Sequence, residues 1–332
     1  MRFPSAITSW AAVLLLGSAV LSSSELRQVG MVGIPGAPGF GQMAFANGML
    51  VMTHQAAAAV DIFDPVRRRV MAQVTGLQSP RGIAVDEAGG KVYVADHGNK
   101  SIAVIATDGW KVIDTIPLPG SPDMLLRDAG KLYWTDAGQG TVSLIDLATK
   151  QTTGSVNLGG TPRDLALDAD QNVVFVTVQD LHQVVAIDPQ LKVVKRFNLD
   201  ASQPTGLIYD GHSQELYVAV RFAVLAINAG TGVEVNRVPA PAGVDALWLD
   251  PESRTLYAAS DGSLLMIHAN GRLMIADEIP TDVKGHTVAY DPAKKLVLLP
   301  GGREGKSKVL MLRPVNASEQ PNSLGDAQAE VR

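Results

Sequence analysis

The chain has 332 residues, of which 46% are hydrophobic and 18% are charged, a composition that can bury a large core. Lys and Arg number 28 against 33 Asp and Glu, and no basic run is present that would line a phosphate backbone, so we expect no nucleic-acid partner. Cysteine is absent, which excludes disulfides, cysteine-ligated zinc and thiol nucleophiles.

The first 24 residues are typical of a secretory signal peptide. Arg2 precedes an apolar stretch from Trp10 to Leu21, and Ser22 to Ser24 supply the small residues of a cleavage site. The alternative is an uncleaved membrane anchor. The apolar stretch of about 12 residues is, however, shorter than the roughly 20 that a membrane-spanning helix needs. We therefore predict a signal peptide over residues 1–24 and a secreted or periplasmic mature chain without a membrane span.

A repeat of about 40 residues runs through the rest of the chain. A turn-closing aspartate, an aromatic residue and an apolar residue before a second turn recur in phase. The aspartates are Asp86, Asp128, Asp168, Asp210, Asp250 and Asp291; the aromatic residues are Tyr93, Tyr133, Phe175, Tyr217 and Tyr257; the apolar residues are Phe63, Ile105, Ile145, Ile187, Ile227 and Ile267.

Each repeat contains four short apolar or alternating runs, separated by turn-forming residues. In one unit these runs are 81–86, 91–96, 101–106 and 111–118. Four-stranded units of about 40 to 45 residues are typical of propeller blades, whereas helical repeats show apolar spacings of three and four.

The repeat predicts an all-β fold, a seven-bladed β-propeller of four-stranded blades in a single domain over residues 25–314. The blades are expected at 39–78, 79–120, 121–160, 161–201, 202–242, 243–283 and 284–314. The last unit has only three strands, and residues 26–38 match the outer-strand pattern of residues 111–122. We expect this N-terminal strand to complete the last blade, close the ring and leave no long open sheet edge. Residues 315–332 are predicted to be a disordered tail.

The sequence resembles the YVTN repeat. Val92-Tyr93-Val94-Ala95-Asp96 and Leu132-Tyr133-Trp134-Thr135-Asp136 carry the pattern, and nearly all of residues 26–314 is covered. The resemblance, which includes the YncE-like group, implies an exported propeller that acts as a ligand- or protein-binding scaffold. The Asn of the motif is replaced here by Asp96, Asp136, Val178, Val220 and Ser260, so a role carried by that Asn does not transfer.

The residue before the innermost strand of each blade is expected at the mouth of the central channel. These seven positions, five of them ionisable, are Gly41, Arg81, Asp123, Arg163, Thr205, Asp245 and His286. The binding residues that we predict for a small polar or anionic ligand are Arg81, Asp123, Arg163, Asp245, His286 and Gln42. In the alternative interpretation, the Arg and Asp side chains neutralise one another in a water-filled channel.

A divalent-metal site on the same face is a further hypothesis. His54, Asp96 and Asp136 end the second strands of three consecutive blades, and imidazole and carboxylate groups ligate divalent metals. Three or more of His54, Asp96, Asp136, Asp123 and His286 must converge for this hypothesis to hold. A bound metal would make a lyase or a lactonase-like hydrolase conceivable, by analogy with other propeller enzymes. Otherwise these residues are ordinary hairpin-turn groups.

The common enzyme signatures are absent: the chain has no GxSxG, HExxH or GxGxxG. Residues 301–307 resemble a phosphate loop, but Pro300 stands where that loop needs its first glycine. We therefore predict a monomeric scaffold without a cofactor, whose partner is an unidentified small polar ligand or a protein. A metal-dependent enzyme and a surface protein without a small ligand remain the alternatives.

Overall fold

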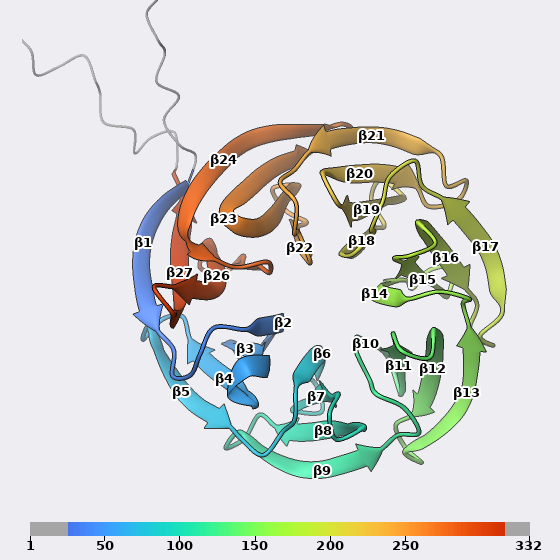
Figure 1. Cartoon of the computed structure of the whole chain (residues 1–332), viewed down its shortest axis with the longest axis horizontal. Coiled ribbons are helices and arrows are strands. Elements are labelled where there is room, and N and C mark those ends of the chain that lie inside the picture. Colours follow the sequence, from blue (N-terminus) through green and yellow to red (C-terminus); the bar gives the residue numbers. More distant parts are fainter. Residues whose placement is uncertain (1–25, 316–332) are drawn as a thin grey trace, which may run out of the picture.

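The computed structural model describes residues 26–315 and consists almost entirely of β-strands arranged around a central axis (Figure 1). The only helix in this range is the short 3-10 helix η1 (Gln55–Ala57), and nothing in it has the length and apolar character of a membrane-crossing helix. The predicted signal peptide, 1–24, and nearly all of the predicted tail, 315–332, lie outside the described residues.

Five sheets of four antiparallel strands form separate blades. The first blade contains β2 (Phe40–Ala46), β3 (Met49–His54), β4 (Ala59–Asp64) and β5 (Arg69–Val74). The second contains β6 (Pro80–Asp86), β7 (Lys91–Asp96), β8 (Ser101–Ala106) and β9 (Lys111–Pro117). The third contains β10 (Leu125–Asp128), β11 (Lys131–Asp136), β12 (Thr141–Asp146) and β13 (Gln151–Asn157). The fourth contains β14 (Pro162–Asp168), β15 (Val173–Val178), β16 (Gln183–Ile187) and β17 (Val193–Asn198). The fifth contains β18 (Leu207–Asp210), β19 (Glu215–Val220), β20 (Ala223–Asn228) and β21 (Glu234–Pro239).

The prediction of seven four-stranded blades is wrong. The structure has five such blades, and the segments 243–283 and 284–314, predicted as two blades, join with the N-terminal strand in one seven-stranded sheet. Its strands are β1 (Leu26–Gly33), β22 (Leu247–Asp250), β23 (Thr255–Ala269), β24 (Leu273–Lys284), β25 (Ala289–Asp291), β26 (Leu296–Arg303) and β27 (Lys306–Pro314). The two parts of this sheet meet where Lys284 of β24 pairs with Gly302 of β26.

Glycines make this junction possible. A Cβ atom on Gly285 would collide with the carbonyl oxygen of Pro300, and one on Gly301 would collide with the carbonyl oxygen of Lys284. Since neither position has a side chain, the end of β24 can approach β26 closely enough to pair with it. Figure 1 shows the long β24 curving inward to meet β26. The glycine-rich segment that resembled a phosphate loop therefore serves as a strand junction followed by a hairpin turn.

The N-terminal strand completes the last sheet, as predicted. β1 pairs antiparallel with β27, from Leu26 opposite Pro314 to Gly33 opposite Lys308. Figure 1 shows the blue β1 lying along the outside of the red β27. Sequence segments almost 300 residues apart thus share one sheet, and the ring is closed by backbone pairing.

The repeated residues have clear structural roles. The aspartates of the first register close the turn between the first and second strands, as where Asp168 accepts the N–H groups of Asp170 and Gln171, both at 3.1 Å. The aromatic residues of the second register are 1% to 5% exposed and pack between neighbouring sheets. Because the second and third strands of each blade are covered on both faces, they form the core, while outer strands such as β13 alternate between exposed and half-buried residues.

A buried cluster holds the segment after β1 against the first blade. His54 and Asp61 are fully buried, and Nδ1 of His54 donates to Oδ2 of Asp61 at 2.7 Å. Nε2 of His54 lies 2.7 Å from the carbonyl oxygen of Ala37, and Ser307 of β27 donates to the carbonyl oxygen of Gly36 at 2.9 Å. Burial acts to lower the pKa of His54, but the hydrogen bonds to Asp61 and Ala37 outweigh it and raise that pKa above its ordinary value.

Gly301→Ala should lower the free energy of unfolding by about 1 to 3 kcal/mol, because the new methyl group must displace the Lys284 carbonyl. Urea unfolding followed by circular dichroism measures the change. Gly130→Ala is the matched control, since a Cβ atom there has no heavy atom within 4 Å and its backbone is not left-handed. Equal stability of the two variants would show that the junction does not depend on Gly301.

His54→Gln should change how stability depends on pH. A raised folded-state pKa stabilises the protein fully below the unfolded value of 6.5, and this contribution is lost as pH rises through the folded-state pKa. The stability advantage of the wild type over the variant should therefore shrink in thermal melts taken from about pH 6 to about pH 9. The control is His212→Gln, because His212 is exposed. A stability advantage that stays constant with pH would contradict the raised pKa of His54.

Candidate functional site

A cavity of about 320 Å³ opens at the mouth of the central channel, between the inner strands. Six of the seven predicted mouth residues line it, together with the predicted binding residue Gln42; the six are Gly41, Arg81, Asp123, Arg163, Thr205 and Asp245. His286 lines a neighbouring groove of about 510 Å³ instead, and Thr287 takes its place in the cavity wall. The Nδ1 atom of His286 lies 2.6 Å from the carbonyl oxygen of Gly243, and its Nε2 atom lies 3.3 Å from Asp261, which accounts for its position.

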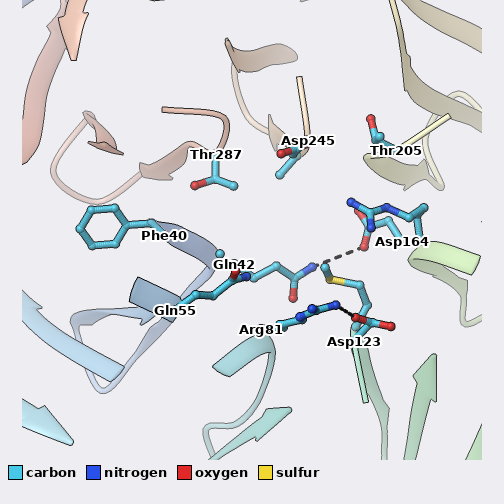
Figure 2. Close-up of a pocket in the computed structure, with 13 residues that line it drawn as sticks. Phe40, Gln42, Gln55, Arg81, Asp123, Asp164, Thr205, Asp245 and Thr287 are labelled. Atoms are coloured by element: carbon cyan, nitrogen blue, oxygen red, sulfur yellow. Dashed lines mark hydrogen bonds and ion pairs between the residues drawn. The ribbon is translucent and has the colours of Figure 1, made fainter. Parts of the chain in front are cut away.

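Arg81 and Asp123 form a closed ion pair on one side of the cavity (Figure 2). The Asp123 side chain is almost completely buried, and its Oδ2 atom also accepts the N–H of Ala137 at 2.8 Å. His97 lies near the same carboxylate, with Nδ1 3.4 Å from Oδ1. For this pair, the interpretation that Arg and Asp neutralise one another agrees with the geometry.

Arg163 and Asp245 line the same cavity without such a partner. Within residues 26–315, neither side chain forms a hydrogen bond or an ion pair, and the Nε atom of Arg163 is buried and unsatisfied. Asp245 is accessible to solvent, and it lines the cavity. The surrounding protein atoms nevertheless desolvate its carboxylate in part, which raises its pKa, while the positive charges of His286 and Arg163 act in the opposite direction. The structure therefore contains a cation and a carboxylate that share one space and are not paired.

Gln42 extends across the channel from the first blade to Asp164 of the fourth (Figure 2). Its Nε2 atom lies 3.4 Å from Oδ1 of Asp164, and its Oε1 atom accepts the N–H of Ile83 at 3.0 Å. Asp164 also accepts the N–H groups of Leu165 and Leu207 at 2.9 and 3.0 Å. Burial nevertheless raises the pKa of Asp164 to about 6, so this carboxyl group titrates close to neutral pH.

Asp164 was not among the predicted binding residues, although the sequence contains a signal for it. The position after each mouth residue holds Gln42, Gly82, Met124, Asp164, Gly206, Ala246 and Thr287. Asp164 is the one charged residue in this register, and Gln42 lies three blades away from it. Two polar residues so placed in a ring can face each other across the channel.

The structure does not bring the predicted metal ligands together. The carboxylate of Asp96 accepts the N–H of Gln78 at 2.6 Å, and that of Asp136 accepts the N–H of Ser121 at 2.9 Å. Each aspartate therefore fixes the segment that enters its own blade. The last position of the YVTN-like motif thus has a structural role in these two blades. Among the described residues, no three His, Asp or Glu side chains are grouped so that they could hold a metal ion.

His54, the third predicted ligand, belongs to an arrangement that resembles a catalytic triad. Oγ of Ser307 lies 3.5 Å from Nε2 of His54, whose Nδ1 faces Asp61. However, Nε2 is closer to the carbonyl oxygen of Ala37, and Ser307 donates to Gly36. A histidine whose two nitrogens both donate cannot accept the proton of a serine, so this buried group holds the chain in place and is not a nucleophile.

Two repeat models match parts of the chain. The NHL repeat matches residues 77–105, and the low-density lipoprotein receptor repeat class B matches residues 130–169. No curated protein matches the sequence.

Solved structures of similar fold have very different sequences. A chain of hydrazine synthase from Kuenenia stuttgartiensis has a TM-score of 0.70 at 15% identity, covering 84% of this chain and 96% of that one. Virginiamycin B lyase from Staphylococcus aureus has a TM-score of 0.70 at 14% identity, covering 88% and 100%. A chain of the mitotic checkpoint complex has a TM-score of 0.74 at 14% identity, covering 95% and 99%. At these identities the likeness concerns the fold alone. Together, the repeat matches and the fold identify the chain as a β-propeller repeat protein with repeats similar to the NHL and low-density lipoprotein receptor class B types.

Proposed function

We propose that the protein binds a small ligand with a carboxylate or similar anionic group at the channel mouth, with Arg163 as the main anchor. The observation that carries this proposal is the unpaired guanidinium of Arg163 in the wall of a cavity. A guanidinium offers a planar fork of donors that fits both oxygens of a carboxylate. The cavity volume of about 320 Å³ lies at the small end of the range for ligand sites.

The remaining cavity wall suits a small polar molecule. Gln55 and Thr287 add neutral donors and acceptors, and Phe40 adds an aromatic surface (Figure 2). Phe40 stacks on the buried His54 with ring centroids 4.2 Å apart, so its orientation is set before any ligand enters. Side chains that are already fixed lose little conformational entropy on binding, which favours affinity.

The same proposal includes a narrower family and a cellular location for the protein. We propose a YVTN-type, YncE-like propeller that acts outside the cytoplasm as a monomeric scaffold. Its support is the pair of YVTN-like segments 92–96 and 132–136 and the apolar stretch 10–21 after Arg2.

The described residues do not favour a metal-dependent lyase or hydrolase. That alternative required three or more of His54, Asp96, Asp136, Asp123 and His286 to converge, whereas no such group of three occurs among the described residues. The lyase and the synthase named above resemble this chain in fold, and a shared propeller fold does not carry an activity with it.

Arg163→Gln should weaken binding of a simple carboxylate such as butyrate by roughly tenfold or more, because the charged half of the contact is lost. Isothermal titration calorimetry measures the affinity. Arg69→Gln is the control, since Arg69 is an exposed arginine on the outer strand β5. Equal loss in both variants, or no binding of any small carboxylate to the wild type, would contradict the proposed anchor.

Butyrate affinity should fall as pH rises through about 6, because Asp164, with its pKa raised to about 6, then becomes negatively charged beside Arg163. We expect binding to be roughly three to ten times tighter at about pH 5.5 than at about pH 7.5, measured by the same calorimetry. The Asp164→Asn variant, which cannot titrate at this position, tests whether Asp164 causes the change. A variant with the pH dependence of the wild type would show that Asp164 is not responsible.

A further inference from the structure

The charges at the channel mouth point to a more specific ligand class. We propose that the cavity binds an amino-carboxylate zwitterion, whose carboxylate pairs with Arg163 and whose ammonium group pairs with Asp245. This inference rests on the proposed function, which by itself requires only the carboxylate. It adds a second charged contact, made by a residue from a different blade.

The other charged groups around the mouth are already engaged. Arg81 forms an ion pair with Asp123, and Nε2 of His286 lies 3.3 Å from Oδ1 of Asp261. Arg163 and Asp245 form no ion pair within the described chain, although both line the same cavity. Opposite charges that face one space without contact leave room for a molecule that contacts both.

Arg163 and Asp245 come from mouth positions two blades apart, and the backbone around Asp245 is fixed. Thr205 occupies the mouth position between Arg163 and Asp245, and its hydroxyl donates to the carbonyl oxygen of Val244 at 2.6 Å. That hydrogen bond fixes the chain next to Asp245. The N–H of Asp245 also donates to the carbonyl oxygen of His286 at 3.2 Å, which restrains the same segment from the other side. The position from which Asp245 enters the cavity wall is therefore set by the ring.

Charge balance favours a ligand that carries both a negative and a positive group. A ligand with only a carboxylate would leave Asp245 unpaired and would be repelled by it, and a simple amine would do the same with Arg163. A neutral polyol could donate hydrogen bonds but would compensate neither charge. Burial raises the pKa of Asp245, as expected for a carboxylate that lacks donors, and an ammonium group would supply them.

A series of ω-amino acids tests the inference and measures the gap. Glycine, β-alanine, 4-aminobutyrate and 5-aminopentanoate carry the same two charges at increasing separation, while butyrate and butylamine each carry one. We expect one member of the series to bind at least tenfold more tightly than either single-charge compound in isothermal titration calorimetry.

Two variants assign the contacts. Asp245→Asn should reduce the affinity of the best ω-amino acid to that of butyrate and should not weaken butyrate, whereas Arg163→Gln should weaken both. Glu304→Gln, which removes a carboxylate from the neighbouring groove, is the matched control and should leave both affinities unchanged. The Asp245 carboxylate forms no hydrogen bond in the described structure, so its variant should fold, and thermal melts verify this.

Each outcome supports or overturns a distinct statement. If butyrate binds as tightly as every ω-amino acid and Asp245→Asn changes nothing, the zwitterion inference is wrong and the proposed function stands. If neither butyrate nor any ω-amino acid binds, both are wrong. If butylamine binds and Arg163→Gln has no effect, the site recognises a cation and both are wrong.

Discussion

The antiparallel pairing of β1 with β27 closes the ring, and the geometry of the channel mouth depends on that closure. Each mouth residue comes from a different part of the sequence, so contacts such as Gln42 to Asp164 exist only while all sheets keep their places. The buried His54 and Asp61 add to the closure, because they fix the segment between β1 and β2 that leads to Phe40 in the cavity wall. A ring closed by backbone hydrogen bonds is also a stable solution for a chain without disulfides.

Threonines in the second strands connect this scaffold to the site. The hydroxyl of Thr53 donates to the carbonyl oxygen of Arg81 at 2.7 Å, and that of Thr177 donates to the carbonyl oxygen of Thr205 at 2.8 Å. Each bond runs from one blade to the mouth residue of the next, and a buried hydrogen bond of this kind contributes about 1 kcal/mol. At these two positions a threonine therefore joins neighbouring blades and also fixes the backbone at which a mouth side chain begins.

The sequence period predicted the strands, the registers of turns and aromatic residues, the completion of the last sheet by β1, and six of the seven residues expected around the mouth, His286 being the exception. These features follow from local patterns repeated in phase. The merging of two units into a seven-stranded sheet could not be predicted in this way, because it depends on the close approach of the backbones of β24 and β26 at Gly285 and Gly301. The sequence also could not show that Arg81 is paired and Arg163 is not. Both arginines occupy the same register, and they differ only in whether a carboxylate lies within ion-pair distance.

The departures from the repeat lie where a ligand would need them. A strictly repeated ring would present the same group from every blade, and such a surface suits a symmetric ion better than a small asymmetric molecule. Here one side of the mouth is neutralised by Arg81 and Asp123, while the other leaves Arg163 and Asp245 open. The bridge from Gln42 to Asp164 crosses the channel between them and adds a group that titrates close to neutral pH. The blades thus supply a frame, and the few positions that break its symmetry give the cavity a direction, so that the proposed amino-carboxylate would have one favourable orientation.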